Sequence, residues 1–268
     1  MGQSAYLSFC HSLVGSRIAC VLILAVSALA SCAPSQVSLA PSLSLTDLSG
    51  DTRIGIAPGA RSADLESAGA NDAELSVGFE AMAKWESRRL SIESAWFDYA
   101  GDGLLTAALG SGGSLLPVGS AVDTDVSLAA HRALFFFEFL PHDRIQVGVG
   151  GGLMYCDYAS SFSSGIQRVS YEQQTLVPVV SAEAMIRVLG ADVAARFAGS
   201  DFAVDAVDVA YSQIDLIVRR EIWGREQGAR IGWLLQYRLL DWRHDSSATD
   251  SESDVSISGF GAGISVSN

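Results

Sequence analysis

The feature that most constrains this chain is a two-residue alternation of apolar and polar side chains along most of its length. In the segment 73–85, Leu75 and Val77 occupy one parity while Glu74 and Ser76 occupy the other. Successive side chains of a β-strand point to opposite faces, so such alternation predicts a long amphipathic strand. The chain is therefore expected to be built from strands of this kind.

The same pattern predicts about ten strands. They are placed near residues 53–59, 73–85, 89–99, 122–139, 144–158, 172–188, 192–199, 206–220, 229–242 and 254–266. Brief breaks between them alternate with longer polar ones at 60–72, 100–121, 159–171 and 243–253, with a shorter one at 200–205.

This asymmetry of connections predicts an all-β fold, a single up-and-down antiparallel β-barrel of 8–12 strands. Membrane barrels have short periplasmic turns and longer extracellular loops. An even number of strands leaves both termini on the periplasmic side.

Charged residues of the polar parity are expected to face the barrel interior. A narrow lumen is filled by small side chains and paired charges. The predicted lumen network comprises Glu80, Glu183, Arg187, Arg196, Asp215, Arg219, Arg230 and Arg238. In a barrel of eight to ten strands these residues form an ion-paired plug. In a wider barrel they line a narrow pore that selects for charge.

In this pattern residues 51–268 resemble the small bacterial outer-membrane β-barrel proteins. The resemblance implies outer-membrane lipid and the barrel assembly machinery as partners. It also implies a structural, surface-interaction or small passive channel role, with small polar solutes or surface ligands as further partners and no cofactor. One departure is the end of the chain. Phe260 and Ile264 alternate as in the final strand of such barrels, but the last residues are Ser267 and Asn268 instead of an aromatic residue.

Two other functions remain as alternatives. The first is a soluble periplasmic lipoprotein with a lipocalin-like ligand cavity, in which the apolar face points inward and the polar face meets water. The sequence favours the membrane barrel because its polar faces are rich in small residues and because Lys84 is its only lysine.

The second alternative is a protease at the barrel rim. Omptins use an Asp pair opposite an Asp/His pair, and Asp123 and Asp125 match the first half of that pattern. Asp241 and His244 depart from the second half, because the omptin pattern is Asp-x-His and the residue two before His244 is Trp242 instead of Asp. No catalytic residue is therefore assigned.

The N-terminus carries the pattern of an export signal. Arg17 precedes an uncharged apolar run, and the run ends in small residues. The ending Leu29-Ala30-Ser31-Cys32 resembles the bacterial lipobox, which implies lipidation of Cys32. The expected organisation is a lipoprotein signal peptide at 1–31, a Ser/Pro/Ala-rich tether at 32–50 and the barrel at 51–268.

Charge and cysteine content exclude several classes of function. Loss of residues 1–31, which hold one Arg and no acid, changes the formal net charge from −13 to −14. Such acidity argues against nucleic acid as a partner. If Cys32 is acylated, Cys156 has no partner for a disulfide, and no Cys/His cluster predicts a metal site. The glycines of 148–153 lie inside an alternating segment and form no phosphate loop.

Overall fold

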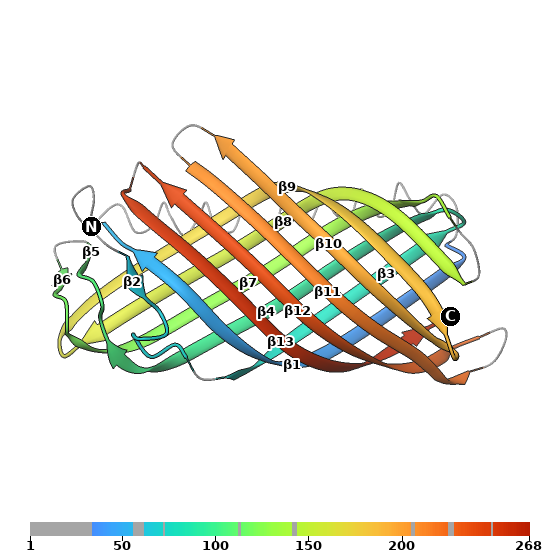
Figure 1. Ribbon diagram of the computed structural model, residues 1–268, viewed down its shortest axis with the longest axis horizontal. Helices are drawn as coiled ribbons and strands as arrows, with labels where there is room; N and C mark the ends of the chain where they lie inside the picture. The colour runs from blue at the N-terminus through green and yellow to red at the C-terminus, as the bar shows by residue number, and fades with distance from the viewer. Residues whose placement is uncertain are drawn as a thin grey trace, which may run out of the picture. The chain divides into compact units, whose positions relative to one another are not determined.

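Ten antiparallel strands close into a ring in the computed structural model, which describes residues 34–55, 62–71, 73–111, 114–140, 144–204, 207–224, 228–247 and 249–268. The order around the ring is β1-β3-β4-β7-β8-β9-β10-β11-β12-β13, and β13 pairs with β1 to close it. The bounds are β1 Gln36–Arg53, β3 Glu74–Trp85, β4 Arg88–Leu104, β7 Ala121–Glu138, β8 Ile145–Ser164, β9 Gln167–Val188, β10 Ala191–Val204, β11 Val207–Gly224, β12 Arg230–Ser246 and β13 Ser251–Ser267. The ring strands lie side by side and obliquely in Figure 1.

Three short strands lie outside this ring of long strands. β2 (Ala63–Asp64) pairs with β1, while β5 (Leu109–Ser111) and β6 (Ser114–Leu116) pair with each other. They gather at the end of the barrel opposite the C-terminus (Figure 1). None of the described residues belongs to a helix long and apolar enough to cross a membrane.

Nine of the ten predicted strands are confirmed. Of the first, 53–59, the structure describes 53–55, where β1 ends at Arg53, and the rest lies outside the described residues. The residues assigned to a tether at 32–50 instead contribute β1, whose partners include Leu45 with Phe260 of β13 and Leu45 with Leu75 of β3. The barrel therefore begins at Gln36, not at residue 51. The signal segment and Cys32 lie outside the described residues.

The predicted long break at 159–171 is also wrong. β8 continues to Ser164, β9 resumes at Gln167, and only Gly165 and Ile166 form the turn between them. Gly165 has a φ of 62°, a left-handed conformation that glycine adopts without steric cost. The polar sequence there forms strand because residues 159–163 of β8 pair with β7 on one edge and with β9 on the other.

Large apolar side chains cover the outer surface across the middle of the ring strands. Val180 on β9, Leu235 on β12 and Ile264 on β13 are 67%, 51% and 58% exposed, whereas Glu183 and Arg196 are buried inside. The soluble, lipocalin-like alternative requires the opposite arrangement, with apolar residues inside and charges in water. The faces are those of a barrel surrounded by lipid.

The connections at the end opposite Gln36 and Asn268 fold inward and pack against the barrel. Leu65 of the segment 62–71 and Leu109 and Leu116 of β5 and β6 are fully buried, in one apolar cluster with Phe162 of β8. Gly69, with a φ of 106°, lies so close to Gly101 of β4 that a Cβ on Gly101 would strike its carbonyl oxygen. This close approach fastens the segment 62–71 against β4.

Candidate functional site

A layer of charged side chains crosses the lumen inside the outer apolar band. Each member has the inward parity of its strand, and most are buried. We call this set the lumen charge layer: Glu80, Arg89, Glu93, Arg132, Glu183, Arg196, Asp215, Arg219 and Arg238.

One part of the lumen charge layer is centred on Glu183 and Glu80. The Glu183 carboxylate accepts hydrogen bonds from Arg89 and from Arg196, each at 2.6 Å. Glu80 accepts one from Arg196 at 3.2 Å and another from Arg219. These bonds join β3, β4, β9, β10 and β11 through the barrel interior.

The other part is centred on Arg132 of β7. Its Nη2 donates to Glu93 at 2.5 Å and to Asp215 at 2.8 Å. Asp215 also accepts from Arg238 Nε at 2.7 Å and from the amide of Gln213. Because buried charges are tolerated when they are paired and hydrogen-bonded, this arrangement is a stable way to fill a lumen.

An aromatic ring lies directly beside the lumen charge layer. The Arg89 guanidinium lies 4.4 Å from the centroid of Phe136, and Arg196 lies 5.8 Å from the same ring. Arginine is attracted to the face of an aromatic ring and stacks on it. Phe136 therefore helps to fill the space between the charged residues.

Six of the eight residues predicted for the lumen network lie in this layer: Glu80, Glu183, Arg196, Asp215, Arg219 and Arg238. The other two lie nearer the mouth where β1 begins and β13 ends. Arg187 pairs with Asp192 at 2.6 Å, and Arg230 pairs with Glu221 at 3.3 Å.

Sequence reasoning missed three members of the layer: Arg89, Glu93 and Arg132. Arg89 and Glu93 share the inward parity of β4, so the alternation of that segment was the signal that could have identified them. Arg132 was obscured by three consecutive phenylalanines at 135–137, which hide the parity of β7.

Aromatic side chains fill the lumen farther from the mouth where β1 begins and β13 ends. Tyr158 of β8 packs on Trp242 of β12 with ring centroids 5.0 Å apart, and Trp242 stacks on His244 at 5.8 Å. Tyr158, Trp242 and His244 are almost completely inaccessible to solvent. The hydroxyl of Tyr171 and Nδ1 of His244 form a hydrogen bond of 3.0 Å. His244 lies beyond the outer apolar band. Its burial within the protein disfavours the charged form and so lowers the pKa of its imidazole.

The residues weighed for a rim protease lie on opposite faces of the barrel wall. Asp123 and Asp125 are exposed on the outer face of β7. His244 is buried on the inner face of β12, while Asp241 has the outward parity of that strand. Activation of one water requires an acid and a base within hydrogen-bond reach of it. The strand faces keep Asp125 and His244 apart.

Carboxylates surround the outer surface where the apolar band ends. On β4 Asp98 follows the outward Trp96, and on β8 Asp157 follows the outward Tyr155. Nine ring strands contribute to this acidic collar: Asp47, Asp98, Asp123, Asp125, Asp157, Glu172, Asp201, Asp208, Asp241 and Asp254. Among described residues of this end, Arg53, Arg168 and Arg243 are the basic ones.

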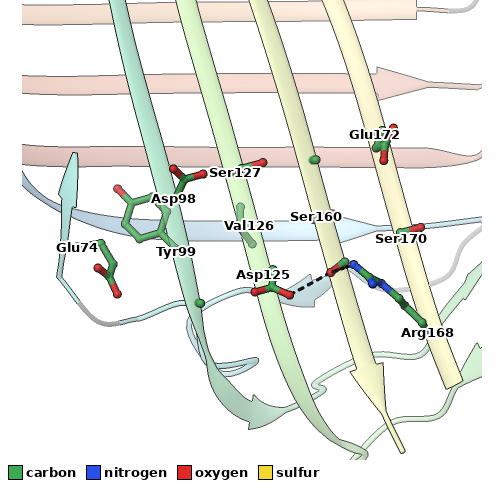
Figure 2. Close-up of a pocket in the computed structure, with 13 residues that line it drawn as sticks. Glu74, Asp98, Tyr99, Asp125, Val126, Ser127, Ser160, Arg168, Ser170 and Glu172 are labelled. Atoms are coloured by element: carbon green, nitrogen blue, oxygen red, sulfur yellow. Dashed lines mark hydrogen bonds between the residues drawn. The ribbon is translucent and has the colours of Figure 1, made fainter. Parts of the chain in front are cut away.

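A shallow pocket of about 740 Å³ opens within the acidic collar. Asp98, Asp125, Arg168 and Glu172 line it from β4, β7 and β9 (Figure 2). The Arg168 guanidinium donates to Ser161 Oγ at 3.0 Å, and Ser161 donates to Asp125 at 3.4 Å. In the part of the chain that the structure describes, no group of three or more His, Cys, Asp and Glu residues is arranged to hold a metal ion.

No protein-family model matches this sequence, and no curated protein matches it. Solved structures do share its fold. The outer membrane protease OmpT from Escherichia coli is 11% identical with a TM-score of 0.55, and the match covers 88% of this chain and 97% of that one.

Two further structures match with lower TM-scores. The transport unit of the autotransporter AIDA-I from Escherichia coli has a TM-score of 0.40 at 8% identity, covering 87% of this chain and 90% of that one. Ail, the attachment invasion locus protein of Yersinia pestis, has a TM-score of 0.35 at 11% identity, covering 87% of this chain and 99% of that one. At such identities the similarity to OmpT establishes the β-barrel fold alone.

Proposed function

We propose that this protein is a bacterial outer-membrane β-barrel with a closed lumen, which acts in envelope structure and surface interaction and does not conduct solutes. The observation that carries the proposal is the double filling of the lumen. Arg132 and Asp215 connect opposite parts of the wall within the lumen charge layer, and buried aromatic residues fill the space beyond it. Among the described residues, buried side chains occupy the lumen at both levels, which supports a closed barrel.

The direction of insertion follows from the connections and the charges. The longer connections and the acidic collar lie at one end, which is the extracellular end of this class of barrel. Both ends of the described ring, Val37 and Asn268, hydrogen-bond to each other at the opposite, periplasmic end. Outer-membrane lipid is then the partner of the apolar band, and the barrel assembly machinery is the partner during insertion.

We also propose that Cys32 carries a lipid. The support is the lipobox pattern Leu29-Ala30-Ser31-Cys32 together with the position of β1, which begins at Gln36, only four residues later. The start of β1 lies at the periplasmic end. A lipid on Cys32 therefore lies within reach of the inner leaflet of the outer membrane.

Two alternatives are disfavoured by specific observations. A passive channel requires an open lumen, which the Arg132–Asp215 ion pair obstructs. A rim protease requires Asp125 and His244 on one face of the wall, and they lie on opposite faces.

Liposome swelling tests the closed lumen with uncharged solutes. Vesicles that contain the purified protein are expected to stay impermeable to a pentose, like protein-free vesicles, whereas vesicles with a general diffusion porin swell. Swelling that increases with the amount of this protein would reject the proposal.

A further inference from the structure

A cavity of about 530 Å³ lies inside the barrel at the periplasmic end, between the lumen charge layer and the mouth. Its walls come from eight ring strands, β1, β3, β4, β8, β9, β10, β11 and β12, and from the end of β13. This volume lies within the range of small-molecule sites. The lumen charge layer closes its inner side, so that the cavity has the form of a vestibule.

The vestibule is basic although the chain as a whole is acidic. Seven of its lining residues are Lys or Arg, and three are Asp or Glu. The formal net charge of the chain is −13. Five of the cationic side chains come from five different strands: Lys84, Arg89, Arg187, Arg219 and Arg230. Lys84 pairs with Glu138 at 2.8 Å and Arg219 pairs with Glu80, and these two acids lie outside the lining.

The three acids of the wall are already engaged. Glu183 accepts from Arg89 and Arg196, Asp192 pairs with Arg187, and Glu221 pairs with Arg230. Donors remain, because a guanidinium has five N–H groups. The Nε atoms of Arg89 and Arg219 are buried without a hydrogen-bond partner among the described residues, and Arg89 is only 7% exposed.

We infer that the vestibule binds a small organic anion that carries at least two phosphate or carboxylate groups. Arginine forks match the oxygens of both groups in bidentate hydrogen bonds. Two or more anionic groups are needed because Lys84, Arg187 and Arg230 approach from separate strands, which a single phosphate or carboxylate group does not span. The compartment that supplies the ligand rests on the proposed orientation, while the site itself does not.

Such a ligand has two sources that share this chemistry, a soluble periplasmic anion and the headgroup of an anionic phospholipid with two phosphates. Titration calorimetry on the full mature protein in nonionic detergent distinguishes them with two probes, pyrophosphate and a short-chain cardiolipin. Saturable binding of pyrophosphate supports the soluble source. Saturable binding of the cardiolipin alone, with no binding of short-chain phosphatidylcholine, supports the headgroup.

The variant pair for this experiment is matched in charge. Arg187→Gln with Arg230→Gln removes two cations from the mouth of the vestibule, where both side chains are partly exposed. Arg168→Gln with Arg243→Gln removes two cations from the outer surface at the other end. Because hydrogen bonds to charged groups contribute strongly to affinity, the first pair is expected to weaken binding about tenfold or more, and the second to leave it unchanged.

Either of two results overturns the inference: neither probe binds saturably, or both double variants weaken binding equally. Circular dichroism of both variants establishes that the barrel is intact before titration. The assay measures binding in detergent, so a channel activity that contradicted the proposed function would leave its outcome unaffected.

Discussion

The guanidinium of Arg132 on β7 lies 2.8 Å from the carboxylate of Asp215 on β11, and β8, β9 and β10 separate these two strands in the ring. The ion pair therefore crosses the lumen and does not join neighbouring strands. Together with Glu93 and Arg238 it forms a connected barrier across the middle of the barrel. The stability of the barrel and the proposed closure of its lumen are thereby linked to the same residues.

Replacing Arg132 with Met is expected to destabilise the barrel by about 3–5 kcal/mol, because Glu93 and Asp215 lose a buried partner. The control Arg243→Met removes an exposed cation that pairs with Glu252 at 3.3 Å, and it should cost less than about 1 kcal/mol. Urea unfolding in lipid vesicles measures both. Equal losses for the two variants would mean that the lumen charge layer does not stabilise the fold.

Replacing Leu235 with Arg is expected to cost about 2–4 kcal/mol, the penalty for a charge at the middle of the bilayer. Leu235 is 51% exposed on the outer face of β12. Leu104→Arg is the matched control, since Leu104 is 58% exposed on β4 beyond Asp98 and above the apolar band. Its expected cost is about 0–1 kcal/mol. A penalty at Leu104 as large as that at Leu235 would place the membrane elsewhere on the barrel.

The sequence was sufficient to predict the barrel because alternation is a direct consequence of strand geometry. The alternation predicted the strand faces correctly where one face is apolar and meets lipid, as on β12, where Leu235 points outward and Arg238 inward. It failed at β1, where Ser42 and Ser44 are inward and small, and where the Ser/Pro composition suggested a tether. A strand that faces a crowded lumen needs small residues, so that composition is consistent with a barrel wall.

The upper lumen was not predictable from alternation. Tyr158 and Trp242 share the inward parity of their strands, yet they are apolar or aromatic like the outward residues. Beyond the apolar band the outer face is polar, so the two faces exchange character along a single strand. Only the positions of segments 62–71, 105–111 and 114–116, which pack into that end, reveal why an apolar interior is needed there.

Acidification is expected to destabilise the folded barrel through His244. Burial lowers the pKa of this imidazole below its ordinary value of 6.5. Below about pH 6.5 the unfolded chain therefore binds a proton that the folded chain does not, and stability falls as the pH falls toward the lower, folded pKa. His244→Gln should remove this part of the pH dependence. His131, the other histidine among the described residues, is present in both proteins. Identical pH profiles for the two proteins would contradict the assignment.

Lipidation at Cys32 predicts the intact mass of protein extracted from membranes. The mass should equal that of the chain from Cys32 onward with a diacyl or triacyl addition. Cys32→Ser should lose the addition and still fractionate with the outer membrane, since the barrel buries far more apolar area than one lipid anchor. An unlipidated chain that begins at Ser31 would refute lipidation and leave the barrel assignment intact.

Ion conductance across a planar bilayer tests the closed lumen most directly, because ions detect a path too narrow for a sugar. Protein refolded from inclusion bodies, and therefore free of native porins, is inserted at high salt. With a closed lumen, no steady current above that of the bare bilayer is expected. Stable ohmic steps that scale with salt concentration, and that change size in Arg132→Met, would contradict it.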